Sequence, residues 1–322
     1  MFKRLFSISL LSLIENFNSG INIIQTMNKF KHFFLALLAV TFAFTSCSKN
    51  DAEDDFDYGN HLPTNYPAGY YKSTEGKTTA ELKTALYNIV KGHKVRTYTN
   101  LWTDFRSTDA RPNGRVWDLY NDKTNYQFGI DQDKGGGDAN SYNREHSFPK
   151  SWFRTGGNND YQNTPMYTDL FHLYPTDSYA NTKRSNNYFY EVQNQSWTNG
   201  YCKLGTSVIP GYGQETVFEP NDEIKGDLAR TYFYFATRYE NENLNAWAGS
   251  KAITKTKYPF LSGWQSAILL KWHRQDPVSE KEVKRNDAIY RIQGNRNPFI
   301  DCPDMAEYIW GSKMGTGYHS TK

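Results

Sequence analysis

Apolar residues recur at the spacing of an α-helix in four segments of the chain. The clearest is 79–90, where the apolar side chains fall on one helical face and Thr78 followed by Glu81 has the pattern of a capping box. The same spacing predicts three further helices: one capped by Asn221 or Asp222 and running to about 240, one near 264–272, and one over 280–292.

Strand patterns are sparse by comparison. Only 115–120 and 126–130 stand out as strand candidates, and the glycine run at 135–137 then interrupts regular structure. No internal repeat and no linker rich in Pro, Gly or Ser is present. We therefore predict an α+β fold dominated by helices and loops, with residues 65–322 forming one domain.

The first 46 residues have the organisation of an export signal. From Met27, two lysines precede an apolar run over 33–44, which is too short for a permanent membrane helix and is followed by small residues before Cys47. Residues 1–26 are interpreted as an upstream extension from a misassigned start codon. The cysteine resembles a lipoprotein processing site, although Phe44 stands where leucine is usual. An ordinary signal peptide with a chance cysteine stays open as the alternative.

Residues 47–64 are polar and acidic, and we expect them to form a flexible tether. If Cys47 carries lipid, the mature protein is attached to a membrane through that lipid. We thus expect an exported protein that is anchored to the outer membrane or cell surface, or secreted or periplasmic.

Composition narrows the class of protein. The mean hydropathy of −0.77 excludes a multi-span membrane protein. The formal net charge is +3, but residues 1–46 hold four of the 37 basic and one of the 34 acidic residues. The remaining chain is therefore neutral overall, so a nucleic-acid partner has to be argued from local chemistry rather than from total charge.

Two cysteines remain after Cys47, namely Cys202 and Cys302. An exported protein meets an oxidising compartment, where these two could pair. They lie far apart in the sequence, so a disulfide and two unpaired buried thiols are both open.

The segment with the most chemical information begins at Glu145-His146. A carboxylate offers a hard oxygen ligand, and the neighbouring histidine offers a base that titrates near neutrality. Asn181 adds a neutral oxygen ligand, with Lys183 and Arg184 close to it in the sequence. One carboxylate, one amide oxygen and several waters suit Mg²⁺, and a metal-bound phosphate beside a histidine base describes a site for phosphodiester hydrolysis.

A Glu-His pair alone is common, but several linked motifs appear here in a fixed order. Asn143-Arg144-Glu145-His146-Ser147-Phe148-Pro149 is followed by Leu173-Tyr174-Pro175, with Asn181 after five more residues, and then by Phe218-Glu219-Pro220, Lys225-Gly226-Asp227, Asp276-Pro277-Val278-Ser279 and Gln293-Gly294-Asn295-Arg296-Asn297-Pro298-Phe299. Over roughly residues 66–312 the chain resembles the endonuclease I family of the ββα-metal (His-Me finger) nucleases.

The resemblance implies a role for each matching residue. Glu145 and Asn181 would bind Mg²⁺, or Mn²⁺, and His146 would be the general base that activates water, giving products with a 5′-phosphate. The family also uses an arginine to steady the phosphate, for which Arg154 is the first candidate and Arg184 the second. Adjacent strand residues point to opposite faces, so Glu145 and His146 can meet at one phosphate only if the strand is distorted or ends there.

The function predicted is thus a metal-dependent endonuclease that hydrolyses DNA, and RNA as a further substrate, with little sequence preference. No helix-turn-helix or zinc-finger pattern that would read bases is visible, and no protein partner is evident. Two alternatives remain: a ribonuclease, and a surface-anchored binding lipoprotein whose nuclease fold is inactive.

Other polar residues near these motifs have two readings each. His172 and Asp169 could support the metal ligands or only the packing around them, and His273 could contact phosphate or be buried structure. The segment 271–296 holds seven Lys or Arg residues against four Asp or Glu residues. It is either a phosphate-binding surface or an ordinary solvated face.

Overall fold

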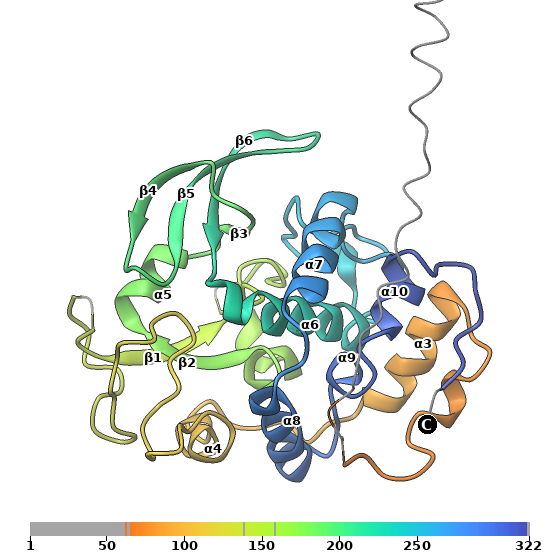
Figure 1. Ribbon diagram of the computed structural model, residues 1–322, viewed down its shortest axis with the longest axis horizontal. Coiled ribbons are helices and arrows are strands. Elements are labelled where there is room, and N and C mark those ends of the chain that lie inside the picture. The colour runs from red at the N-terminus through yellow and green to blue at the C-terminus, as the bar shows by residue number, and fades with distance from the viewer. Residues whose placement is uncertain (1–61, 63–64, 138, 158, 321–322) are drawn as a thin grey trace, which may run out of the picture. The chain divides into compact units, whose positions relative to one another are not determined.

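The computed structural model describes residues 62, 65–137, 139–157 and 159–320, which fall within one compact unit (Figure 1). The helices are α3 (Thr79–Val90), α4 (Leu101–Thr108), α5 (Ser178–Arg184), α6 (Asp222–Arg238), α7 (Gly263–Gln275), α8 (Glu280–Gln293), α9 (Pro298–Asp301) and α10 (Met305–Trp310). The strands are β1 (Tyr142–His146), β2 (Leu173–Asp177), β3 (Tyr188–Phe189), β4 (Asn194–Thr198), β5 (Lys203–Ile209) and β6 (Gly213–Glu219). The predicted α+β class is confirmed.

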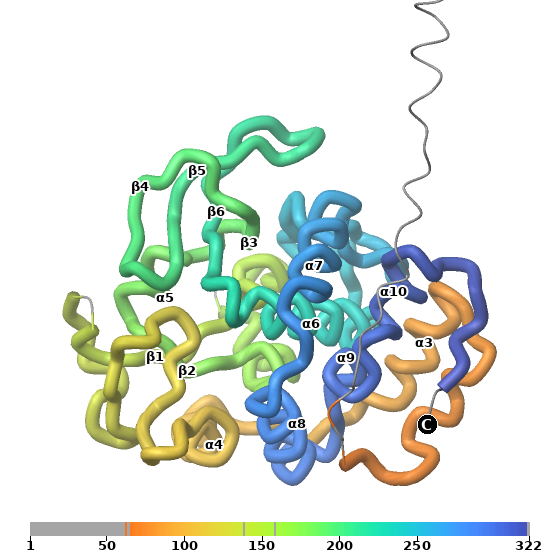
Figure 2. Tube along the Cα trace, in the orientation of Figure 1, coloured from red at the N-terminus to blue at the C-terminus, as the bar shows by residue number. Residues whose placement is uncertain are grey.

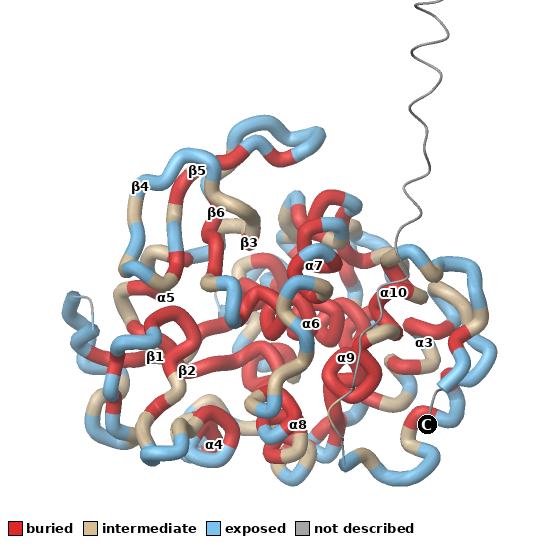
Figure 3. The backbone as a smooth tube through the Cα atoms, in the orientation of Figure 1, coloured by how far each residue is buried: buried red, intermediate tan, exposed pale blue. Residues whose placement is uncertain are grey.

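Helix α6 is the centre of the core. Every residue from Ile224 to Arg238 is buried, and Figure 3 shows the helix enclosed by other elements. The side chain of Asn221 caps the helix by accepting a hydrogen bond from the amide of Glu223. Helices α3, α7 and α9 pack against α6, and in Figure 2 the orange α3 lies beside the blue α10 from the far end of the chain.

The four predicted helices are all present, although their ends differ from the sequence prediction. Helix α7 extends beyond the predicted 264–272, and α8 begins with a complete capping box between Ser279 and Glu282. The capping box predicted at Thr78 is absent, because the Thr78 side chain makes no cap hydrogen bond. The next residue, Thr79, has a φ of 43°, so the chain enters α3 with a non-helical backbone turn.

The two predicted strands do not form. Within 115–120 and 126–130 the described backbone makes one isolated bridge, between Ala110 and Val116, and no ladder. The buried carboxylate of Asp118 instead accepts hydrogen bonds from the amide of Tyr120 and the hydroxyl of Thr176. A side chain therefore satisfies a backbone amide that a neighbouring strand would otherwise pair, and the segment 115–120 stays irregular.

The real strands form two small sheets. Strands β1 and β2 pair antiparallel, with Glu145 opposite Tyr174 and His146 opposite Leu173. The second sheet has the order β3-β6-β5-β4, and β3 runs parallel to β6. Sequence patterns missed this second sheet because β4 is mostly exposed and polar, and so lacks the alternation that marks a half-buried strand.

Cys202 and Cys302 are both buried and unpaired, which is the second of the two alternatives left open by the sequence. No helix among the described residues is long and apolar enough to cross a membrane. The predicted signal, Cys47 and most of the predicted tether lie outside the described residues.

Candidate active site

Strands β1 and β2 and helix α5 bring the three sequence-predicted residues of the centre together. Glu145 and His146 are the last two residues of β1, and Asn181 lies in the middle of α5. The segment Leu173-Tyr174-Pro175 lies within β2 and pairs with β1. The chain then turns at Asp177, whose carboxylate caps α5 by accepting a hydrogen bond from the amide of Ala180. This is the strand-strand-helix unit that the resemblance predicts.

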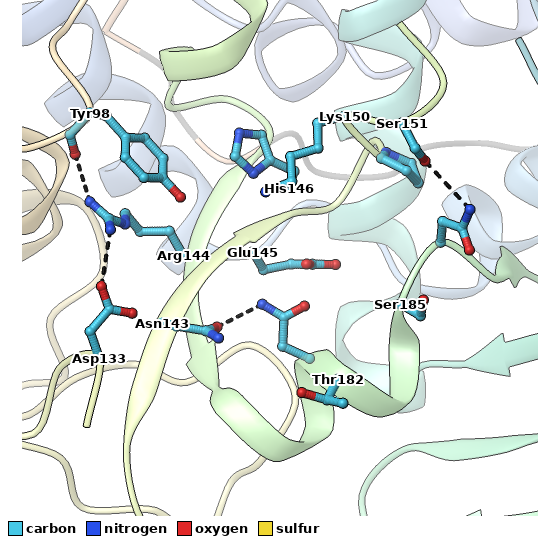
Figure 4. A pocket seen from close by; sticks show the side chains of 13 residues that line it. Tyr98, Asp133, Asn143, Arg144, Glu145, His146, Lys150, Ser151, Thr182 and Ser185 are labelled. Atoms are coloured by element: carbon cyan, nitrogen blue, oxygen red, sulfur yellow. Dashed lines mark hydrogen bonds and ion pairs between the residues drawn. The ribbon is translucent and has the colours of Figure 1, made fainter. Parts of the chain in front are cut away.

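These elements enclose a pocket of about 530 Å³ (Figure 4). Its lining comes from β1, the loop after β1, α5 and three other loops: Tyr98, Asp133, Asn143, Arg144, Glu145, His146, Pro149, Lys150, Ser151, Asn181, Thr182, Ser185 and Asn186. Glu145 and His146 both reach this pocket because β1 ends at His146, as the geometric argument required.

Glu145 is buried but only partly paired. Its Oε1 atom accepts a hydrogen bond from the Tyr120 hydroxyl at 2.9 Å and lies 3.4 Å from Nη1 of Arg184. No side-chain donor among the described residues contacts Oε2. Burial raises the pKa of Glu145, and the nearby Arg184 opposes that rise. A carboxylate in this state gains from a cation in the pocket, because the cation would stabilise its charged form.

His146 is held in one orientation by a carbonyl and by ring stacking. Its Nε2 atom lies 3.0 Å from the carbonyl oxygen of Tyr167, and the Tyr167 ring stacks on the imidazole at 5.2 Å between centroids. Because a carbonyl only accepts, Nε2 carries the proton and Nδ1 remains a proton acceptor. Burial, together with the charges of His172 and Lys150, lowers the pKa of His146 well below 6.5. The ring is therefore neutral at physiological pH, as a general base must be.

Asn181 completes an oxygen donor set. Its Nδ2 atom donates a hydrogen bond to Oδ1 of Asn143 at 2.6 Å, the bond dashed from Asn143 in Figure 4. No donor among the described residues contacts Asn181 Oδ1. One carboxylate and one amide oxygen in one pocket fit a hard divalent cation that retains several waters. The described residues contain no group of three or more His, Cys, Asp or Glu side chains suited to a metal.

The arginines occupy different places. Arg154 is exposed and does not line the pocket. Arg184 is fully buried behind Glu145, where its guanidinium also donates to the carbonyls of His146 and Ser147. Arg144 lines the pocket with its guanidinium over the rings of Tyr98 and Trp102, at 3.6 and 4.0 Å from their centroids.

The other polar residues singled out in the sequence belong to the protein interior. Asp169 accepts hydrogen bonds from the hydroxyls of Tyr234 and Tyr239. His172 contacts the carbonyl of Met166, and His273 that of Pro303. In the segment 271–296, six of the seven Lys and Arg residues form ion pairs with carboxylates of the protein: Lys271, Arg274, Lys281, Lys284, Arg285 and Arg296. This pairing favours the structural reading of the segment.

The sequence is similar to those of known nucleases. The sequence profile described as Endonuclease I matches residues 78–304, which is more than half of the chain. The chain belongs to the Endonuclease I family. An extracellular ribonuclease of Bacillus subtilis (strain 168) is 35% identical over 86% of this chain and 93% of its own length. An extracellular ribonuclease of Bacillus amyloliquefaciens is 36% identical over 75% of this chain and 78% of its own length.

More distant relatives carry a different substrate in their names. An extracellular deoxyribonuclease of Aeromonas hydrophila is 26% identical over 42% of this chain and 50% of its own length. As a member of the Endonuclease I family, which is generally metal-dependent, the protein is an endonuclease that hydrolyses phosphodiester bonds. Glu145, His146 and Asn181 all lie within the matched segment.

Sequence reasoning missed several residues that line the pocket of this endonuclease or hold the residues that line it. Tyr120 binds Glu145, and Asn143 binds Asn181. Tyr167 holds His146, and Lys150 lines the pocket. Asn143 and Lys150 stand within a few residues of the Glu-His pair, so their position was a usable signal. Tyr120 lies in a distant loop and Tyr167 in a short 3-10 helix, and neither carries such a signal.

Proposed function

We propose that this endonuclease cuts nucleic acid with Glu145 and Asn181 as the ligands of one divalent cation and His146 as the general base. The observation that carries the proposal is a single pocket that holds a partly paired carboxylate, an amide oxygen and a neutral imidazole. The intact set also speaks against the alternative of an inactive fold that only binds.

Each of these residues has its own role in the hydrolysis. His146 takes a proton from water through Nδ1, while Nε2 keeps its own proton and donates it in a hydrogen bond to the Tyr167 carbonyl. Water adds to phosphorus and the bond to the 3′ oxygen breaks. The leaving 3′ oxygen takes a proton from solvent water, and the products are a 5′-phosphate and a 3′-hydroxyl. The bound cation supplies electrostatic stabilisation of the phosphate charge. Asn143 fixes the Asn181 amide so that its oxygen is available to the pocket.

For the cation we propose Mg²⁺, with Mn²⁺ as a functional substitute, because both accept oxygen ligands and retain water. Cleavage should stop in excess chelator and return when Mg²⁺ or Mn²⁺ is added. Full activity of protein that has been exhaustively stripped of metal would contradict the one-metal proposal. The readout is the rate of plasmid and RNA degradation under identical buffer conditions.

For the substrate we propose both RNA and DNA. The two relatives that cover most of the chain are named ribonucleases, whereas those named deoxyribonucleases cover less of it. A water nucleophile does not require a 2′-hydroxyl, so matched RNA and DNA oligonucleotides should both be cut. Their products should carry 5′-phosphates. A 2′,3′-cyclic phosphate from RNA would show that the 2′-hydroxyl attacks, and would contradict the role given to water.

We further propose export with a lipid on Cys47. The sequence pattern before Cys47 and the names of the relatives, extracellular or periplasmic, support export. The mature protein should partition with membranes, and Cys47→Ala should release it or leave its signal uncleaved. Wild-type protein found wholly in the medium without lipid would refute the anchor and leave the nuclease proposal intact.

A further inference from the structure

The cationic side chains around the active-site pocket differ in how many ion pairs and hydrogen bonds they make with other groups of the protein. Arg144 forms an ion pair with Asp133 at 3.1 Å and donates to the carbonyl of Tyr98. Arg184 lies behind Glu145, with its donors on backbone carbonyls and on the hydroxyl of Tyr232. Lys150 forms no ion pair with any carboxylate in the described part of the chain, and its ammonium lies 5.6 Å from the Tyr161 ring centroid.

Lys150 is close enough to the reacting residues for its charge to act on them. It lines the same pocket as Glu145, His146 and Asn181, and Figure 4 shows its side chain beside His146 and above Glu145. Its charge lowers the pKa of both Glu145 and His146, although burial is the larger influence on each. An uncommitted cation at this position favours an anion in the pocket.

The loop that carries Lys150 is fixed to the core. The Phe148 ring stacks on Phe235 with centroids 3.8 Å apart, and Trp152 donates its backbone amide to the carbonyl of Pro149. The hydroxyl of Tyr232 binds the carbonyl of Ser147 at 2.9 Å. Since the backbone on both sides is anchored, only the lysine side chain has to be ordered when a phosphate arrives, which lowers the entropic cost of binding.

We propose that Lys150 is the phosphate-binding cation of this active site and contacts a non-bridging oxygen of the scissile phosphate. This inference rests on the proposed function, and it gives the phosphate to Lys150 rather than to Arg154, the first sequence candidate. The phosphate gains negative charge as water adds to it. A fixed cation at that oxygen therefore binds the transition state more tightly than the ground state.

The test uses the full-length protein and three lysine variants. Lys150→Met removes the charge, and Lys150→Arg keeps it. Lys91→Met is the matched control, because Lys91 also lies over a tyrosine ring, at 5.3 Å from the Tyr87 centroid, but does not line the pocket. Arg154→Met is measured beside them as the rival assignment.

The first measurement is binding of a labelled single-stranded DNA oligonucleotide in excess chelator, where nothing is cut, across a range of salt concentrations. Loss of one phosphate contact should lower the slope of log affinity against log salt by about 0.7 in Lys150→Met. Lys150→Arg and Lys91→Met should keep the wild-type slope. A wild-type slope in Lys150→Met, or the loss appearing in Arg154→Met instead, overturns the proposal.

The second measurement separates this role from a structural one. In saturating Mg²⁺, kcat of Lys150→Met should fall by about 10²–10³-fold, the usual cost of removing one fixed group that stabilises transition-state charge. Mn²⁺ should bind this variant as tightly as wild type or more tightly, because the variant lacks the positive charge of Lys150, which repels a cation bound at Glu145. Weaker Mn²⁺ binding would show that Lys150 supports the pocket structure, and would also overturn the proposal.

The activity of the wild-type protein shows whether the role of Lys150 or the proposed nuclease function has failed. If the wild-type protein cuts nucleic acid while Lys150→Met matches it in slope and kcat, only the role of Lys150 fails. If the wild-type protein cuts neither RNA nor DNA with Mg²⁺ or Mn²⁺, the proposed function fails and this inference fails with it.

Discussion

Two arginine–glutamate pairs in this molecule are equally buried, but they differ in how many oxygens of the carboxylate are paired. In the helical core, Arg230 Nε and Nη2 lie 2.5 and 2.8 Å from the two oxygens of Glu282, so both carboxylate oxygens are paired. At the pocket, Arg184 approaches one oxygen of Glu145 at 3.4 Å, and its guanidinium also donates to backbone carbonyls and to the hydroxyl of Tyr232. All four side chains are at most 4% exposed.

The difference separates a structural pair from a functional one. A buried charge is costly unless it is fully paired and hydrogen-bonded, so the core pair has the arrangement that stability requires. Glu145 keeps one oxygen without a side-chain donor, which is a destabilising arrangement for a buried carboxylate unless a cation occupies the pocket. The pocket region therefore gives up stability in exchange for a ligand site.

The largest expected effect breaks the core pair. Arg230→Met leaves Glu282 buried without its partner, and should cost about 3–5 kcal/mol in the free energy of unfolding. Urea denaturation measures the loss, and cleavage per folded molecule should stay near wild type. Adding Glu282→Gln should recover part of the stability, because it removes the unpaired buried charge and keeps an acceptor for the α8 capping box with Ser279. A loss below about 1 kcal/mol in Arg230→Met would contradict the structural assignment of this pair.

The second-largest effect is expected at the pocket, where the variant should lose metal affinity and keep its stability. Glu145→Gln keeps an oxygen that can accept from Tyr120 but removes the charge, so the fold should persist. Metal affinity should fall by more than the 10–100-fold typical of changing a residue behind a metal ligand. Glu282→Gln is the matched control and should lose stability with unchanged metal affinity. Equal metal binding by the Glu145→Gln variant and wild type would remove Glu145 from the ligand set.

The third prediction concerns pH and follows from the lowered pKa of His146. At saturating Mg²⁺, kcat should stay level as pH falls through 6.5, where an unshifted histidine would become protonated. For stability, the unfolded chain binds this proton below 6.5 and the folded chain does not, so His146 contributes a loss of stability as pH falls. Relative to wild type, His146→Asn should therefore gain about 1.4 kcal/mol per pH unit below 6.5.

The pH comparison is made between variants because buried carboxyl groups shift the opposite way. Burial raises the pKa of Asp118 to about 6, for example, so its protonation favours the folded state as pH falls. The difference between His146→Asn and wild type cancels such contributions. A kcat that halves near pH 6.5 would mean that the imidazole titrates normally, and hence that it is not buried as described.

The smallest effect concerns the amide pair. Asn143→Ala frees the Asn181 side chain to rotate, since it removes the acceptor of its Nδ2 hydrogen bond. The net value of such a bond is about 0.5–1.5 kcal/mol, so metal affinity should fall by roughly 2–10-fold. Calorimetric Mn²⁺ titration measures it. Unchanged affinity would show that Asn181 needs no support from Asn143.

Helices were predictable from the sequence because their apolar period and caps are local signals. The pattern over 280–292 agrees with α8 to within a residue. In the predicted strand 126–130, the amide of Gln127 donates to the carboxylate of Asp131 rather than to a neighbouring strand. The strand predicted over 115–120 was wrong because the carboxylate of Asp118 accepts from the backbone amide of Tyr120 and is held in place by Thr176 and Asp177, far along the chain. Tertiary contacts of this kind leave no periodic trace.

The sequence predicted the three central residues of the site, but not the groups that contact them. Glu145, His146 and Asn181 were found through motif order, and the fold places all three in one pocket. Arg184 behind Glu145 and the Tyr167 carbonyl on His146 depend on how loops pack, so sequence spacing gave neither. The choice of Arg154 relied on its position after the Glu-His pair, and that assignment stays a prediction for the variant series above.

The most direct test of the account is His146→Ala, followed by cleavage rate, Mn²⁺ affinity and melting temperature on one preparation. If His146 is the general base, the rate should fall by about 10²–10⁴-fold while metal and nucleic-acid binding persist. The melting temperature should stay close enough to wild type for the protein to be folded during the assay. A folded His146→Ala protein that cuts RNA and DNA at a near wild-type rate would contradict the central claim.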